Sequence, residues 1–221
     1  MVESPVQARR RRKEARPQEL LDAALELFVE KGFAATRAEE VAQRAGVSKG
    51  TLYLYYPSKE ELLKAVIREH LSARIAAGAV LAEQHRGPMA PLLRDVFSHW
   101  WQSVIDSPTS GVFKLIITEV RNFPDIADFY HREVIEPGER LIGSIVQRGI
   151  DSGEFERLDV GAVVHSLVLP MVMVCLHKHS LGACSRHVDH LDTQSFVLAH
   201  IDLVIRGLAR QPGAGRAKAR P

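Results

Sequence analysis

The sequence predicts an all-α fold, in which a small N-terminal domain of three helices precedes a larger helical domain. Apolar residues recur with the three- to four-residue spacing of helices almost throughout, and the alternation typical of strands is scarce. A chain of 221 residues, of which 46% are apolar, can bury a sizeable core as one or two domains. We divide it into residues 1–15, 16–63, 64–210 and 211–221.

Composition excludes several classes of protein. The formal net charge is only +2, so the chain cannot coat nucleic acid through bulk charge, and such binding would need a local patch. No apolar run approaches the length of a membrane span, and no apolar signal core follows the arginine-rich start. The two cysteines do not suggest a disulfide scaffold. We therefore expect a cytoplasmic protein with no membrane partner.

The first helix is predicted from Pro17 to Lys31, because proline suits a first helical position and Gly32 can end the helix. Its buried face comprises Leu20, Ala24, Leu27 and Phe28. The residues before it, 1–15, are expected to be a disordered basic arm with RRRRK at positions 9 to 13.

The second helix is predicted to begin at Thr36. Thr36 and Glu39 have the spacing of a capping box. In this motif the hydroxyl of Thr36 accepts from an early backbone N–H of the helix, and the carboxylate of Glu39 accepts from the backbone N–H of Thr36. A short apolar face follows, and Gly46 can adopt the left-handed conformation that ends a helix.

The third helix is predicted from Lys49 to Tyr55, with Ser48 as its cap and Pro57 as its end. Leu52 and Tyr56, four residues apart, are assigned to the core. Ser58 and Glu61 have the spacing of a second capping box, which opens a long helix through His70. Two short helices joined by a turn that contains glycine form a helix-turn-helix unit.

The start of the third helix has the chemistry needed to enter the major groove of DNA, where small or cationic leading residues are favoured. Lys49 can donate to a guanine or a phosphate, Thr51 can contact a base, and Gly50 lets the backbone approach closely. The hydroxyls of Tyr53 and Tyr55 are expected to reach phosphates. The basic arm then has two interpretations, a solvated tail or a contact with phosphates or the minor groove.

Two further cations are expected near phosphates. Lys59 lies in the first turn of its helix, where the helix dipole disfavours a positive charge, and a nearby phosphate would explain it. Arg37 lies at the start of the second helix, a position at which the dipole favours an anion.

The segments LLDAALELFVEKGFAAT and VAQRAGVSKGTLYLYYPSKEELL resemble the DNA-binding domain of the TetR family of transcriptional regulators. The resemblance implies that residues 16–63 bind double-stranded DNA. It carries over as contacts Arg37, Ser48, Lys49, Gly50, Thr51, Tyr53, Tyr55 and Lys59. Glu39 and Glu40 depart from the pattern, because a position that is basic in some relatives is acidic here.

Residues 64–210 are predicted to be helical, and the basic tail 211–221 to be disordered. Pro137 should kink or interrupt its helix, and Pro170 should bend the helix from Asp159 to His177, which would leave room for a ligand. Candidate ligand-binding residues combine bulky apolar side chains with polar groups on apolar helices: Trp100, Phe113, Ile117, Arg121 and His165. The alternative is that these side chains simply belong to the core.

The last two helices look too apolar for the surface of a monomer. Residues 160–176 are apolar nearly all round, and the final helix carries two apolar stripes. They form either an interior helix pair or a contact with a second copy of the chain. The resemblance implies the latter, since members of the family dimerise through their last two helices, and a twofold dimer would bind a palindromic operator.

The leading hypothesis is a repressor that a small, largely apolar effector releases from its operator. One alternative is a metal- or thiol-responsive regulator that uses the Cys- and His-rich segment 175–190, although its spacing matches no standard zinc pattern. Another is a helical enzyme or carrier that retains a DNA-binding module. We identify no catalytic residues, no metal site and no cofactor, and we predict that the protein is not an enzyme.

Overall fold

The structure is a computed structural model that describes residues 5–119, 121–180, 182 and 192–209, with side chains from residue 16 onward. Within these ranges the regular elements are helices, apart from one isolated antiparallel bridge between Phe155 and Ala209. The prediction of an all-α fold is confirmed.

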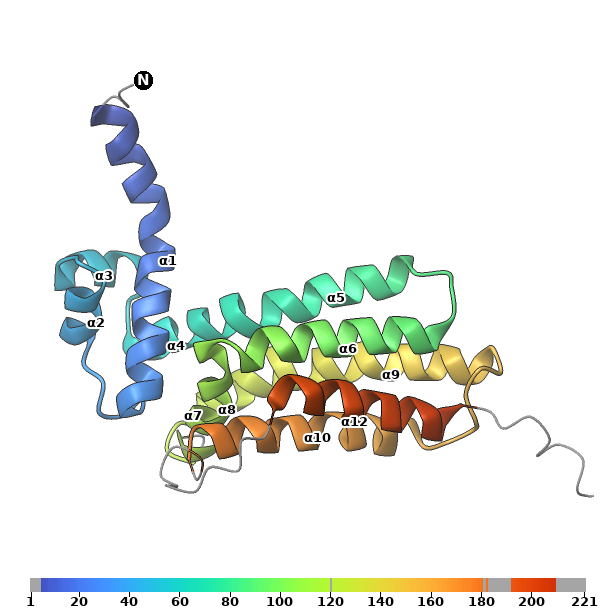
Figure 1. The fold of residues 1–221 in the computed structure, drawn as a ribbon. Helices are drawn as coiled ribbons and strands as arrows, with labels where there is room; N and C mark the ends of the chain where they lie inside the picture. Colours follow the sequence, from blue (N-terminus) through green and yellow to red (C-terminus); the bar gives the residue numbers. More distant parts are fainter. Residues whose placement is uncertain (1–4, 120, 181, 183–191, 210–221) are drawn as a thin grey trace, which may run out of the picture.

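Four helices form the N-terminal part: α1 (Pro5–Lys31), α2 (Ala38–Arg44), α3 (Lys49–Tyr55) and α4 (Lys59–Ile67). In Figure 1, α2 and α3 lie beside α1, whose first turns extend away from the rest of the molecule. The turn between α2 and α3 contains Gly46, which has a positive φ of 66°, as expected for the residue that ends a helix. The predicted helix-turn-helix unit is therefore present.

The helix that begins with α4 continues into the rest of the chain through a π-helical turn. The elements that follow are η1 (Arg68–Ser72, π-helical), α5 (Ala73–Gln84), α6 (Met89–Ile105), η2 (Pro108–Ser110), α7 (Gly111–Glu119), α8 (Pro124–Tyr130), η3 (His131–Ile135, π-helical), α9 (Glu136–Asp151), α10 (Val160–Lys178) and α12 (Thr193–Leu208). Figure 1 shows α5, α6, α9, α10 and α12 running roughly along one common direction.

One contiguous apolar core runs through both parts. The most deeply buried side chains of the N-terminal part include Phe28, Phe33 and Leu52. In the rest of the chain, Phe97 and Met171 are similarly well buried. Helix α1 packs against α2 and α4 and also touches α7, so the helix-turn-helix unit is seated on the larger helical body.

The start of α1 corrects the prediction for the arm. Residues 5–15 are helical, so disorder over residues 1–15 is wrong for this range, and α1 continues through Pro17. The segment is rich in Gln, Ala, Arg, Lys and Glu, which favour helix, and this preference prevails over the hydrogen bond lost at proline. The expected disordered tail, residues 211–221, lies outside the described residues.

The start of α2 also differs from the prediction. Thr36 does not cap the helix, because its hydroxyl donates to the carbonyls of Gly32 (2.7 Å) and Leu27 (3.2 Å) at the end of α1. Arg37 is the N-cap residue, and the carboxylate of Glu40 accepts from its backbone N–H at 3.1 Å. The capping pair is thus shifted by one residue, since Thr36 is buried against α1.

The two prolines of the body behave differently. Pro137 lies in the first turn of α9, directly after the π-helical turn η3, so the predicted interruption is present. Pro170 lies inside α10, which continues past it to Lys178.

Helix α10 is the described helix that is long and apolar enough to cross a membrane, so the expectation of no run of that length is wrong. A core helix of a soluble protein has the same composition, and α10 packs on α7, α9 and α12. Only 33% of the apolar stretch of α10 is buried within the chain, however. Leu169 (59% exposed) and Met173 (62% exposed) remain on the surface.

Candidate functional site

Helix α3 is fixed by its cap and by one buried face. The hydroxyl of Ser48 accepts from the backbone N–H of Thr51 at 3.1 Å, and the two hydroxyl oxygens lie 2.9 Å apart. Leu52 is fully buried, as predicted, and Tyr56 is half-buried, so burial raises the pKa of its phenol. These contacts orient the opposite face of α3 toward solvent.

The exposed face of α3 contains most of the predicted DNA contacts. Lys49 and Gly50 are exposed, Tyr53 is 39% exposed, and Tyr55 lies half-buried on the other side. Leu54, which the sequence reasoning missed, is 85% exposed on the same face. Its position four residues after Gly50 was the available signal, because helical neighbours at that spacing share a face.

Lys49 is paired with an acidic residue of α2. Its ammonium donates to the carboxylate of Glu39 and lies 5.8 Å from the centre of the Tyr53 ring. The hydrogen bond between Lys49 and Glu39 raises the pKa of the lysine and lowers the pKa of the glutamate. Arg37 is exposed at the start of α2. A phosphate or base that binds Lys49 must therefore compete with Glu39.

Lys59 has a different role from the one expected. Its ammonium donates to the backbone carbonyls of Phe33 (2.8 Å), Ala34 (3.2 Å) and Thr36 (3.1 Å), and it lies 4.5 Å from the centre of the Phe33 ring. An ammonium has three N–H donors, and all three are used here. In the described structure this lysine therefore joins α4 to the loop between α1 and α2, and a phosphate that binds it would have to compete with these carbonyls.

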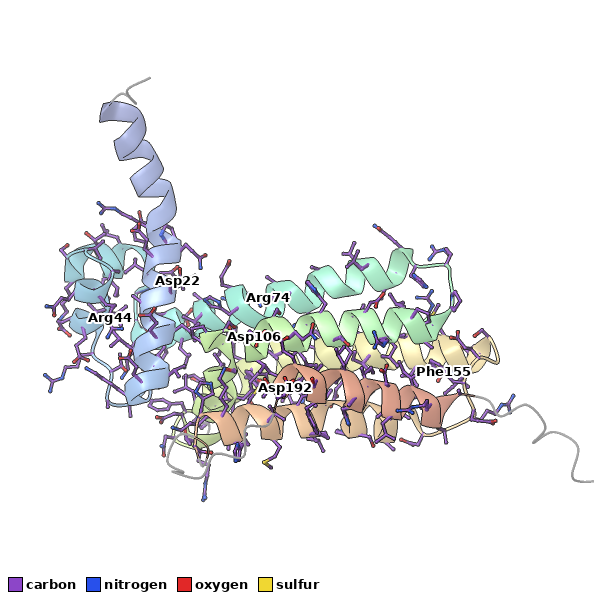
Figure 2. All side chains as sticks on the ribbon, in the orientation of Figure 1. Asp22, Arg44, Arg74, Asp106, Phe155 and Asp192 are labelled. Atoms are coloured by element: carbon purple, nitrogen blue, oxygen red, sulfur yellow. The ribbon has the colours of Figure 1, made fainter. Side chains whose placement is uncertain are left out.

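A cavity of about 1480 Å³ lies in the helical body, with walls from α5, α6, α7, α8, η3, α9, α10 and α12. Trp100, Phe113, Ile117 and His165 line it, so four predicted ligand-binding residues are brought together. Arg121 does not line it, because α7 ends at Glu119 and Arg121 is exposed in the turn that follows. Figure 2 shows Arg74, which also lines the cavity, near the start of α5.

Aromatic side chains build one wall of the cavity. Trp101 lies between Trp100 and Phe113: its ring centre is 4.6 Å from that of Trp100 and 5.5 Å from that of Phe113. Phe97 contacts the same tryptophan at 6.2 Å. Tyr130 is buried in the lining, and burial raises the pKa of its phenol. Such walls suit a largely apolar ligand.

The charged groups of the lining are mostly paired. The guanidinium of Arg94 donates to both carboxylate oxygens of Asp202, at 2.6 Å and 3.1 Å. His165 has one ring nitrogen 3.5 Å from the Glu139 carboxylate and the other 2.9 Å from the Gly161 carbonyl. His165 thus bonds to the backbone of its own helix, and its side chain is 60% exposed.

Within the described part of the chain, two polar atoms of the lining lack a hydrogen-bond partner. The indole nitrogen of Trp100 and the hydroxyl of Ser98 are buried without a hydrogen bond. Buried indole N–H groups normally find an acceptor, and an unpaired one costs free energy. Sequence patterns give no signal for such atoms, because pairing depends on the packing of distant helices.

The Cys- and His-rich segment is described only in part. Cys175 is buried, and burial raises the pKa of its thiol to about 12, so the reactive thiolate is disfavoured. A ring nitrogen of His179 lies 2.7 Å from the Ser110 hydroxyl. Cys184, His187 and His190 lie outside the described residues. Among the residues that are described, no three His, Cys, Asp or Glu side chains gather to hold a metal.

Two π-helical turns connect the cavity to α4. Residues of η3, including Val134 and Ile135, line the cavity, and η3 packs on η1, which follows α4 directly. Glu119, at the end of α7, also accepts from the backbone N–H of Ala34 at 3.4 Å. The helices that line the cavity are therefore in contact with α4 and with the loop before α2, the two segments that flank the helix-turn-helix unit.

Comparison with known proteins matches residues 20–66 to the family model of the bacterial regulatory proteins, tetR family. YfiR of Bacillus subtilis, an uncharacterized HTH-type transcriptional regulator, is 28% identical over 165 residues, which cover 72% of this chain and 77% of YfiR. RutR of Escherichia coli, an HTH-type transcriptional regulator, is 47% identical over 62 residues, which cover 28% of this chain and only 29% of RutR.

Among solved structures, the transcriptional regulator FadR of Bacillus subtilis in complex with stearoyl-CoA superposes with a TM-score of 0.68. The match covers 86% of this chain and 98% of FadR, with 19% sequence identity. At this identity the likeness establishes a shared fold, from the helix-turn-helix unit through the helical body.

Proposed function

We propose, from the premise that this chain belongs to the TetR family of transcriptional regulators, that it is a homodimeric repressor which an apolar ligand releases from a palindromic operator. The observation that carries the proposal is the physical connection between an exposed recognition helix and a large apolar cavity. Such a regulator works in the cytoplasm, where the DNA is. The proposal contains no catalytic step, and turnover of a bound small molecule would contradict it.

DNA contact is assigned to the exposed start and outer face of α3 and to the start of α2. The contacts we propose are Arg37, Ser48, Lys49, Gly50, Thr51, Tyr53 and Tyr55. Lys59 is left out, because its donors already bind three carbonyls. The lysine and the hydroxyls supply donors for bases and phosphates, while Gly50 allows close approach of the backbone.

The dimer is proposed to form through α10 and α12, the last two helices. In α12, Val197, Ile201 and Leu208 are buried within the chain, whereas Leu203 is 64% exposed. Met173 of α10 is likewise exposed, as is Leu169, which also lines the cavity. These exposed apolar side chains on the last two helices are what a second copy would cover. A twofold axis there would present two copies of α3 to two half-sites of one operator.

Release is proposed to follow the contact between the two π-helical turns. A ligand that occupies the cavity presses on η3, η3 shifts η1, and η1 moves α4 together with the helix-turn-helix unit. Such a shift changes the distance between the two recognition helices of the dimer. The free energy comes from the difference in ligand affinity between the two arrangements, typically about 1–3 kcal/mol.

Selection from random DNA duplexes by the purified protein tests the DNA-binding part. The selected motif should be a short palindrome with half-sites about one helical turn, or a multiple of it, apart. A folded protein that enriches no motif at either low or moderate salt would contradict the proposal.

A further inference from the structure

The cavity has a distinct polar corner at the junction of α5 and α6. The guanidinium of Arg74 donates to the hydroxyl of Ser103 at 2.9 Å, and this hydroxyl donates to the backbone carbonyl of Trp100 at 2.7 Å. All three residues line the cavity. The corner therefore places a guanidinium of α5 close to the backbone of Trp100, a residue of α6 whose indole N–H has no acceptor among the described residues.

The two side chains in this corner share one chemical property: both are hydrogen-bond donors and neither can accept. An indole offers one N–H, and a guanidinium offers five. The Ser103 hydroxyl is the partner of Arg74 within the part of the chain that the structure describes, so the remaining donors of the guanidinium are available. Any group that satisfies this corner must accept hydrogen bonds, and an ionised carboxylate offers the most acceptor sites together with the charge that a guanidinium favours.

The electrostatics of the lining support an anion in the same place. Arg94, the other arginine of the lining, is already paired with Asp202. Of the lining carboxylates, Asp95 lies near Arg94, whose pKa it helps to raise, and Glu139 lies beside His165. Arg74 pairs with no carboxylate in the described structure. Arg74 is exposed, so its positive charge is free to attract an anion at this end of the cavity.

We propose that the cavity binds an amphipathic carboxylate with a long apolar body. The carboxylate is held by Arg74 and by the indole N–H of Trp100, and the apolar body lies along Trp101, Phe113 and Val134. The indole nitrogen is covered by its surroundings, so Trp100 turns toward the head group as the ligand enters. This inference rests on the proposed function, because it names the chemical class of the effector.

The ligand test uses intrinsic fluorescence, since both tryptophans of the chain line the cavity. Palmitate, hexadecanol, methyl palmitate and palmitoyl-CoA are titrated separately, below the concentrations at which they aggregate, into the full-length protein. Palmitate should bind at least about tenfold more tightly than hexadecanol or the methyl ester, the difference expected for one charge-assisted hydrogen-bonded pair. Equal affinities for the acid and the alcohol would overturn the assignment of the head group, as would binding of the coenzyme A ester alone.

Three variants locate the head group. Arg74→Gln and Trp100→Phe should each weaken palmitate binding and leave hexadecanol binding unchanged, with Trp101 as the remaining reporter in the second. Arg140→Gln changes an exposed arginine of α9 that does not line the cavity, and it should alter neither affinity. Unchanged palmitate affinity in both cavity variants would contradict the proposal.

DNA binding is followed on the same samples by fluorescence anisotropy of the selected operator. Operator binding without any binding of the four lipids would refute this inference and leave the DNA-binding proposal intact. Lipid binding without operator binding would support this inference and contradict the DNA-binding proposal.

Discussion

The guanidinium carbon of Arg68 lies 4.7 Å from the centre of the Phe129 ring. This contact joins η1, which follows α4, to the end of α8. The same arginine lies 4.0 Å from Glu133 in η3, and Lys64 lies 5.8 Å from the Phe129 ring. The helix that continues from α4 contains the π-helical turn η1, and the helix that continues from α8 contains η3. Such turns are frequent at functional sites. This cluster is the contact through which we expect the cavity to influence α4.

Arg68→Ala should weaken the coupling between ligand and operator by about 0.5–2 kcal/mol. The cause is the loss of the contact that makes η1 follow η3. The operator dissociation constant is measured with and without saturating palmitate, and the ratio of the two should fall toward one. Arg132→Ala, which removes an exposed arginine of η3, is the control and should preserve the ratio. Loss of coupling in the control alone would refute the assigned route.

Lys49→Ala should weaken operator binding and leave thermal stability almost unchanged, because its pair with Glu39 is exposed and such pairs contribute little to stability. The slope of log affinity against log salt should become shallower by about one if Lys49 binds a phosphate. Glu39→Gln should have the opposite effect and tighten binding, since it removes the competitor of the DNA. Equal operator affinity in all three proteins would show that this lysine does not touch DNA.

Lys59→Met should lower the free energy of unfolding by about 1.5–3 kcal/mol, the range for hydrogen bonds to a charged group. The change leaves the carbonyls of Phe33, Ala34 and Thr36 without their common donor. Chemical denaturation, with Lys49→Ala as the matched lysine control, measures the difference. A variant of normal stability with impaired operator binding would instead restore the phosphate contact predicted from the sequence.

Leu203→Glu should convert the dimer into monomers, because it places a charge in the apolar surface of α12. Sedimentation velocity measures the change, and operator affinity should fall with it. Leu54→Glu, the same change at an exposed leucine of α3, should leave the dimer intact. A wild-type sedimentation coefficient for Leu203→Glu would place the interface elsewhere.

The burial of Cys175 predicts a loss of stability in alkaline solution. Its pKa is raised from 9.0 to about 12 in the folded protein, so above pH 9 the unfolded chain releases a proton that the folded chain keeps. Stability from this thiol is fully present below pH 9 and is lost as the pH rises toward 12, at up to about 1.4 kcal/mol per pH unit. Cys175→Ala should show a shallower decline in denaturation experiments between pH 9 and 11. An identical decline would mean that the thiol ionises normally in the folded protein.

Sequence patterns that involve only neighbouring residues were sufficient to predict much of the structure of the N-terminal part. Ser48 and Gly46 behave as predicted, because a cap and a left-handed turn involve only the residues beside them. Thr36 and Lys59 do not, because their hydrogen bonds run to the end of α1 and to the loop after it. Contacts between segments distant in sequence cannot be inferred from local spacing.

The cavity was predictable only in its apolar part. The bulky side chains of Trp100 and Phe113 were recognisable from their helical spacing, and both line it. Arg121 lies outside the lining, since α7 ends at Glu119, before this residue. Arg74 was missed because an exposed arginine near the start of a helix gives no sign of facing a cavity. The two π-helical turns follow no sequence rule that we could apply.

The most direct test of the central claim is the dissociation constant of the selected operator, measured on one preparation with and without a ligand that quenches cavity tryptophan fluorescence. We predict that a saturating ligand weakens operator binding by about 5- to 150-fold, the range that corresponds to 1–3 kcal/mol of coupling. Equal dissociation constants with the cavity demonstrably filled would contradict the claim that cavity occupancy controls DNA binding.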